Sequence, residues 1–228
     1  LPYLLTDPVQ KAEYRAMLLS VDLRIAVSDA VLRSHADQGD GRLALVRNGI
    51  DSTAGRPLSV ERRREIGLSD TDKLLLTVAR LTAQKGHAVL LDAVPSVLER
   101  EPDARFVLVG LGPEQGAIEG QIRAAGLDHV VRLVGARRDV SDLLASADLF
   151  VLPSHFEGLP LALLEAMAAG VPVVASAIGG TVEAIGAAHP HLVPPGDPGQ
   201  LADAIVDALA NPAKTAGASA AARTRFAA

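Results

Sequence analysis

Two cations and two carboxylates are spaced along this 228-residue chain in a way that could bind a charged ligand rich in hydroxyl groups. Arg80 and Lys85 lie in a segment that follows an apolar run and precedes a helical pattern. A guanidinium donates two parallel hydrogen bonds and a lysine ammonium acts as a mobile point charge, so the pair suits a diphosphate. The alternative is that both residues are solvated loop charges.

The carboxylates Glu157 and Glu165 lie on either side of the start of a predicted helix. Pro160 suits a helix start and Gly170 a helix end, which predicts a helix over Leu161–Ala169. Glu165 is then the one charged residue of an apolar helix. Because an unpaired buried carboxylate costs several kcal/mol, we expect Glu165 to have a partner, such as a ligand diol. The alternative is a glutamate at a partly open edge that the helix dipole stabilises. Free amides at this helix N-terminus also favour a phosphate.

Three glycine-containing loops could bring the backbone close to a ligand. Gly110–Gly116 is a near miss to the dinucleotide fingerprint, with one residue too many before its third glycine, so we expect a tight turn in which Gly110 contacts a ligand. Gly135 leaves space for a flat base, whereas the neighbouring Arg137 is by default a surface charge. Gly179 and Gly180 at a helix start would let amides approach an anion.

From residue 73 onward, short apolar runs alternate with helical patterns. Strands without a polar face belong to a parallel sheet that helices cover on both sides. This order predicts a doubly wound, Rossmann-like α/β fold, in which ligands bind at the carboxyl ends of the strands. The predicted strands are Lys73–Ala79, Arg105–Val109, Val130–Val134, Leu149–Leu152, Val171–Ala175 and His191–Val193. The predicted helices are Ala88–Arg100, Glu114–Ala125, Val140–Ser146, Leu161–Ala169, Thr181–Ala187 and Pro198–Leu209.

The first 46 residues predict a separate α/β unit. Its expected elements are a helix over Val9–Leu19, a strand over Leu23–Val27, a helix over Asp29–Ala36 and a strand over Leu43–Val46. Residues 47–57 are the expected linker, with a turn at Asn48-Gly49 because this dipeptide favours positive φ. Residues 58–211 form the expected main domain, and 212–228 a final Ala-rich helix.

Composition excludes several classes of protein. Hydrophobic residues make up 49% and charged residues 21%, as in a globular chain, and no apolar run is long enough for a transmembrane helix. A net charge of −5 with 3% aromatic residues argues against a nucleic-acid partner. Cysteine is absent, so there is no thiolate or disulfide chemistry, and the six histidines have no metal-ligand spacing. Because the chain starts at Leu1, we expect part of a longer protein.

The ordered set of motifs resembles family 4 retaining glycosyltransferases of the GT-B fold. The residues that carry the resemblance are Arg80, Lys85, Glu157, Glu165, Gly179-Gly180 and Asn48-Gly49-Ile50-Asp51. It implies that residues 58–211 form the C-terminal domain, which binds a nucleotide-sugar. It also implies that residues 1–46 are the remnant of an N-terminal, acceptor-side domain, and that 212–228 begin the crossover helix that returns to it.

The resemblance also implies roles for these residues. Arg80 and Lys85 would hold the donor diphosphate and stabilise the leaving group, Glu157 would lie beside the sugar ring, and Glu165 would bind the ribose hydroxyls. The backbone amides that would face phosphate or sugar oxygens are those of Gly158, Leu159 and Leu161. The residues that would lie near the base are Gly135, Ala136 and Arg137.

The expected activity is transfer of a sugar with retention, without a bound metal or other cofactor. The acceptor stays open among lipid-linked, polysaccharide and small-molecule classes, and the expected location is the cytoplasm, including the inner membrane face. With most of the N-terminal domain absent, we expect donor binding but little or no transfer by this chain alone. The alternatives are a non-catalytic nucleotide-binding module and a related GT-B sugar epimerase or phosphorylase.

Overall fold

The structure of the chain is a computed structural model that describes residues 8, 16–17, 21–36, 42–50 and 54–227. A six-stranded parallel sheet forms its larger unit, with the strand order β5-β4-β3-β6-β7-β8. This order confirms the doubly wound fold, and its direction reverses between β3 and β6. The strands are β3 Lys73–Val78, β4 Ala104–Val109, β5 Val131–Leu133, β6 Leu149–Leu152, β7 Val173–Ser176 and β8 Leu192–Val193.

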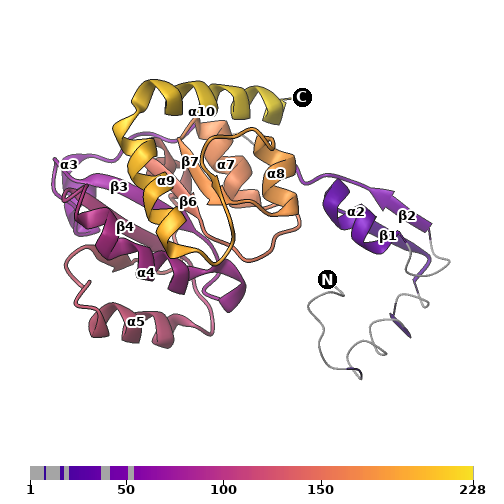
Figure 1. The fold of residues 1–228 in the computed structure, drawn as a ribbon, viewed down its shortest axis with the longest axis horizontal. Coiled ribbons are helices and arrows are strands. Elements are labelled where there is room, and N and C mark those ends of the chain that lie inside the picture. The colour runs from indigo at the N-terminus through magenta and orange to yellow at the C-terminus, as the bar shows by residue number, and fades with distance from the viewer. Residues whose placement is uncertain (1–7, 9–15, 18–20, 37–41, 51–53, 228) are drawn as a thin grey trace.

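Helices cover both faces of this sheet, because successive side chains of a strand point to opposite faces. Along β3, Leu75 packs into one apolar core, whereas Leu74 and Leu76 pack into the other. On the first face lie α4 His87–Leu98, α5 Gln115–Ala124 and α9 Pro198–Ala210 (Figure 1). The second core is formed with α6 Val140–Ser146, α7 Leu161–Ala169 and α8 Gly179–Ile185.

Three further helical segments complete the larger unit. The first, α3 Val60–Glu65, is capped by Ser59, whose side chain accepts a hydrogen bond from the Arg62 amide; this helix was not among those predicted. A short 3-10 turn, Ala83–Lys85, follows β3. The last helix, α10 Pro212–Ala227, packs on α7, α8 and α9. None of the helices in the described part of the chain is long and apolar enough to cross a membrane.

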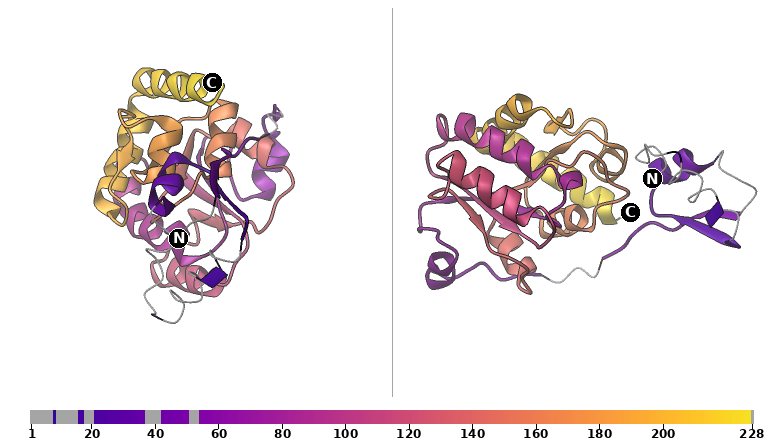
Figure 2. Two further views of the ribbon diagram at one scale, coloured as in Figure 1. Left: turned by 90° about the vertical axis from the view of Figure 1, so that its right-hand side faces the viewer. Right: turned by 90° about the horizontal axis from the view of Figure 1, so that it is seen from below.

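A smaller unit precedes the sheet and lies beside α8 (Figures 1 and 2). It consists of β1 Leu23–Ala26, α2 Asp29–His35 and β2 Arg42–Leu45, and its two strands pair in parallel in a sheet of their own. As predicted, α2 starts after Ser28, whose side chain accepts a hydrogen bond from the Val31 amide. The assignment of this unit to a separate domain stays a prediction.

Some boundaries differ from the prediction for local reasons. Strand β7 starts two residues late because Gly170 closes α7 with a positive φ, and the Val171 amide bonds back to the helix. The predicted Asn-Gly turn is wrong, since Gly49 has no positive φ and no turn is assigned there. The predicted helix over Val9–Leu19 lies almost wholly outside the described residues, as does Asp51 of the predicted turn.

Candidate functional site

The loops after β3 and β6 meet where the strand order reverses. Two hydrogen bonds tie them together: the His155 amide donates to the Gln84 carbonyl over 2.8 Å, and the Gln84 side chain donates to the Phe156 carbonyl over 2.8 Å. Because these neighbouring parallel strands end at one edge of the sheet, residues 72 apart in the chain are brought into contact. The functional site predicted from sequence therefore centres on this junction.

Gly86 permits the close approach of the two loops. Its φ of +66° lies in the left-handed region, and a Cβ atom at this position would stand 2.0 Å from the Pro153 carbonyl oxygen. No residue with a side chain fits here without moving the backbone. This requirement was not predicted from the sequence, although Lys85-Gly86 before a helix was an available signal.

An ion pair joins the two loops. The Lys85 Nζ lies 2.5 Å from Glu157 Oε1, and the two side chains are only 15% and 6% exposed. The Ser154 hydroxyl donates to the same carboxylate oxygen over 2.8 Å. Glu157 is thus a buried carboxylate with partners inside the protein, whereas the expectation that a ligand diol partners Glu165 stays a prediction. Ser154, whose part in the site was not predicted, completes the arrangement.

Arg80 lies on the same loop but is exposed, and no described side chain forms an ion pair with it. Its position is fixed by the backbone on either side. The Leu81 amide donates to the Leu111 carbonyl, and the Glu114 amide donates to the Leu81 carbonyl, each over 3.0 Å. A guanidinium without an ion-pair partner among the described residues, on the anchored loop that also carries Lys85, can receive an anionic group with little reorganisation.

Gly110 contributes to this anchoring, and its predicted contact with a ligand stays a prediction. Its Cβ would stand 1.9 Å from the Ala79 carbonyl oxygen, and its φ is +146°. Its amide donates to the Gly135 carbonyl over 2.9 Å. The predicted tight turn after β4 is therefore present, and it packs against the backbone that carries Arg80.

The N-terminus of α7 faces the junction without a side-chain cap. The residue before its first turn is Pro160, which offers no capping side chain. Among the described residues, the amides of Gly158, Leu159 and Leu161 donate to no acceptor. The Leu159 carbonyl accepts a hydrogen bond of 2.9 Å from the Asn48 side chain, which ties the segment after β2 to this loop. Free amides at a helix start stabilise an anion.

Glu165 opens onto a hollow instead of the protein core. The hollow has a volume of about 360 Å³, and residues of α6, α7 and the segment after β2 line it, including Ser141, Ala168 and Gly55. The Glu165 side chain is half-buried and has no hydrogen bond or ion pair among the described residues. Burial therefore raises its pKa above the ordinary value. A carboxylate in this state has acceptor oxygens available for ligand hydroxyls.

The loop after β5 borders the same region. Gly135 has a φ of +68° with open space beside it, as the prediction for a flat ligand requires. Arg137 is not free, because it makes two hydrogen bonds of 2.8 and 2.7 Å with the Asp139 carboxylate. This pairing holds the pKa of Asp139 at about 2. Arg138, rather than Arg137, lines the hollow, and the exposed Ala136 lies between Gly135 and the arginines.

Several known proteins are similar to this chain. The family described as "Glycosyl transferases group 1" matches residues 60–225. An uncharacterized glycosyltransferase of Methanocaldococcus jannaschii is 37% identical over 64% of this chain and 39% of its own length. A phosphatidyl-myo-inositol mannosyltransferase of Mycobacterium leprae is 35% identical over 82% of this chain and 50% of its own length. The chain thus spans half or less of these curated relatives.

Solved structures are also similar to this chain. Anabaena Alr3699/HepE, crystallised with UDP and glucose, is 28% identical with a TM-score of 0.80, and the match covers 91% of this chain and 59% of that one. WaaG, a glycosyltransferase involved in lipopolysaccharide biosynthesis, is 25% identical with a TM-score of 0.78, over 100% of this chain and 65% of its own. These likenesses confirm the predicted fold class, a Rossmann-like half of the GT-B fold. The chain belongs to the group 1 glycosyltransferase family.

Proposed function

We propose that this chain binds the nucleotide-diphosphate-sugar donor of a retaining glycosyltransferase of family 4. The observation that carries the proposal is the contact of Lys85 with Glu157, because it joins the loop that carries Arg80 and Lys85 to the loop that leads into the uncapped start of α7, where the strand order reverses. Two cations and a helix N-terminus at one place suit a diphosphate. The UDP and glucose bound to Anabaena HepE support a ligand of this class.

In this proposal, the other parts of the donor lie in or near two hollows of the structure. Glu165 accepts hydrogen bonds from the ribose hydroxyls, and the base lies over the open space at Gly135, next to Ala136 and Arg137. Glu157 lies beside the sugar ring, in a second hollow of about 260 Å³.

Transfer requires stabilisation of the departing nucleoside diphosphate. The acceptor hydroxyl oxygen forms a bond to the anomeric carbon as the bond to the diphosphate breaks, and the hydroxyl proton passes to the departing phosphate on the same face of the sugar. Arg80 and Lys85 stabilise the negative charge that develops on that phosphate. Because the chain spans half or less of its curated relatives, we expect donor binding without efficient transfer by the chain alone.

A thermal-shift panel tests donor binding. UDP, GDP, ADP, dTDP and a sugar derivative of each are added to the wild-type chain, and one of them should raise its melting temperature. The Arg80→Ala substitution should abolish this shift, whereas Arg123→Ala, which removes an exposed arginine from α5, should leave it unchanged. The absence of any shift with all eight compounds would refute the proposal.

Product analysis separates transfer from the alternatives. The full-length protein is incubated with the donor that the panel identifies and with candidate acceptors. Transfer with retention yields a glycoside of unchanged anomeric configuration. Binding without turnover indicates a non-catalytic module, and an altered free nucleotide-sugar or a sugar phosphate indicates an epimerase or a phosphorylase.

A further inference from the structure

Glu183 links the two units of the chain at the edge of the candidate site. It lies on α8, and its carboxylate oxygens accept hydrogen bonds from the backbone amides of Asp29 and Ala30, over 3.0 and 3.1 Å. These are the first two amides of α2, which have no partner within their own helix. The carboxylate of one unit thus caps a helix of the other, across 154 residues of sequence.

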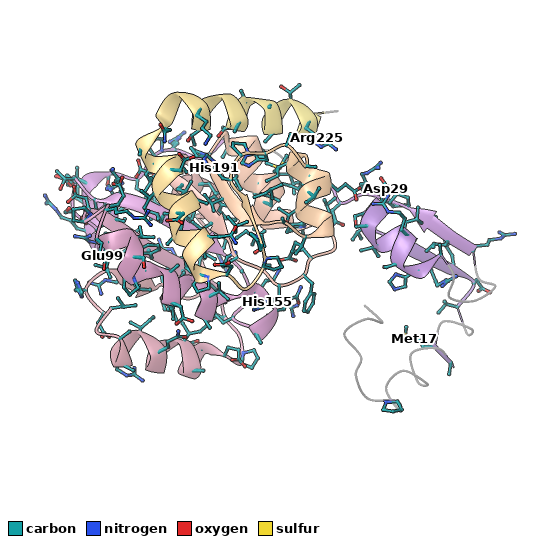
Figure 3. All side chains as sticks on the ribbon, in the orientation of Figure 1. Met17, Asp29, Glu99, His155, His191 and Arg225 are labelled. Carbon is teal, nitrogen blue, oxygen red and sulfur yellow. The ribbon has the colours of Figure 1, made fainter. Side chains whose placement is uncertain are left out.

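Arg47 strengthens this connection. Its Nε donates to Glu183 Oε1 over 3.1 Å, and its guanidinium also pairs with Asp29. The Glu183 side chain is 15% exposed, so its carboxylate is largely shielded from water, whereas the Arg47 side chain is 56% exposed. On the other side, the Arg225 Nε of α10 donates to the Glu183 backbone carbonyl over 2.9 Å. Figure 3 shows Asp29 at the end of α2 that faces α8, and Arg225 near the end of α10.

Two glycines allow close packing here, Gly179 between the two units and Gly180 within the larger unit. A Cβ on Gly179 would stand 2.6 Å from the Ala30 Cβ, and a Cβ on Gly180 would stand 2.0 Å from the Gly158 carbonyl oxygen. From the sequence, these glycines were expected to let amides approach an anion. Their close neighbours are α2 and the loop after β6, so the pair makes room for protein packing, and the approach of an anion to these amides stays a prediction.

The helix that Glu183 holds forms a wall of the hollow beside Glu157. Ala30 and Val31 of α2 border this hollow of about 260 Å³, and the opposite side is formed by residues of the loops after β6 and β7. No residue of α2 borders the hollow of Glu165. A shift of α2 would therefore change the Glu157 side of the site and leave the Glu165 side in place.

We infer that Glu183 is a positioning residue that sets the sugar end of the donor site. It does so by docking α2 over the hollow of Glu157. The inference rests on the proposed function, because it assigns that hollow to the donor sugar. Loss of the carboxylate should weaken recognition of the sugar and leave recognition of the nucleoside diphosphate almost unchanged.

Two variants and a matched control test this inference. Glu183→Gln removes the charge and one of the two acceptor oxygens, and Arg47→Ala leaves both hydrogen bonds to α2 in place. The control is Glu99→Gln, an exposed glutamate at the end of α4, on the far side of the larger unit from Asp29 (Figure 3). Each protein is titrated with the nucleotide-sugar that gives the largest thermal shift and with the matching nucleoside diphosphate.

The expected result is selective. Glu183→Gln should lower the affinity for the nucleotide-sugar about tenfold and change the affinity for the nucleoside diphosphate less than about twofold. Arg47→Ala should lower the affinity for the nucleotide-sugar by an intermediate factor. A general loss of folding would lower the affinity for both ligands equally. Equal weakening of both ligands, or an unchanged affinity for the nucleotide-sugar, would overturn the inference.

Hydrogen exchange provides a readout that needs no ligand. The amides of Asp29 and Ala30 should exchange at least about tenfold faster in Glu183→Gln than in the wild type, while amides of β3 keep their protection. Unchanged exchange at these two amides would overturn the docking role. If no nucleotide-sugar binds the wild type, the proposed function fails, whereas the exchange experiment still decides whether Glu183 docks α2.

Discussion

The ion pair between Lys85 and Glu157 makes a prediction that stability measurements can check without any ligand. Replacing Lys85 by methionine keeps the side-chain stem and removes the ammonium. Glu157, which is 6% exposed, then keeps only the hydrogen bond from Ser154. We expect this substitution to lower the free energy of unfolding, because a carboxylate shielded from water loses its counter-charge.

The magnitude follows from the geometry. Leaving a fully buried charge unpaired costs about 3–5 kcal/mol, and a charge-assisted hydrogen bond contributes about 1.5–3 kcal/mol. Lys85 is 15% exposed and one hydrogen bond to Glu157 survives, so we expect a loss of about 2–3 kcal/mol. For a chain of this size, that loss corresponds to a fall of roughly 5–10 °C in the melting temperature.

A double-mutant cycle isolates the pair. Glu157→Gln removes the charge that Lys85→Met leaves unpaired, so the double variant should recover all but about 1 kcal/mol of the loss. The assay is urea unfolding of the wild type, both single variants and the double variant. A change below about 0.5 kcal/mol in Lys85→Met, or no recovery in the double variant, would refute the reasoning about the pair.

The same double variant separates stability from ligand binding. Because Lys85 is proposed to hold the donor diphosphate, the double variant should stay folded and still fail to show a thermal shift with the nucleotide that stabilises the wild type. A full nucleotide shift in this variant would mean that Lys85 contacts only Glu157 and has no role toward the ligand.

Three further predictions follow from single positions. Gly86→Ala should lower the free energy of unfolding by at least about 2 kcal/mol, because the new Cβ meets the Pro153 carbonyl. The control is Gly120→Ala in α5, which should be neutral or stabilising because the space beside Gly120 is open. Urea unfolding compares the two variants. Burial raises the pKa of Glu165, so ionised Glu165 reduces stability as pH rises through that pKa. Glu165→Gln should therefore raise the melting temperature at pH 7 by on the order of 1 °C, lose this gain below about pH 4, and bind nucleotide more weakly. Burial lowers the pKa of His87 to about 4, so the unfolded chain takes up a proton between about pH 6.5 and 4 that the folded chain does not. Wild-type stability should decrease as pH falls through this window, and His87→Leu should flatten the decrease by on the order of 2–3 kcal/mol; equal slopes for both proteins would contradict it.

The sequence determined the architecture because local patterns encode it. Predominantly apolar strands such as those at residues 73–78 and 149–152 have no polar face for water, and helical patterns separate them, so a parallel sheet with two helical layers follows. Parallel strands end at one edge, so the loops with Arg80, Lys85 and Glu157 are predicted to lie at the same edge of the sheet, but only the pairing of β3 with β6 makes them neighbours. Helix caps such as Ser28 and Gly170 are also readable from the sequence, because capping depends on the nearest residues.

The tertiary structure alone decided which groups face one another across the site. It paired Lys85 with Glu157, and it left Glu165 open to a hollow. It also placed Glu183 on the first amides of α2, a contact over 154 residues that no periodicity signals. The physical reason is that burial, pairing and close approach depend on the atoms that folding brings alongside a residue, and sequence spacing fixes only those within the same element.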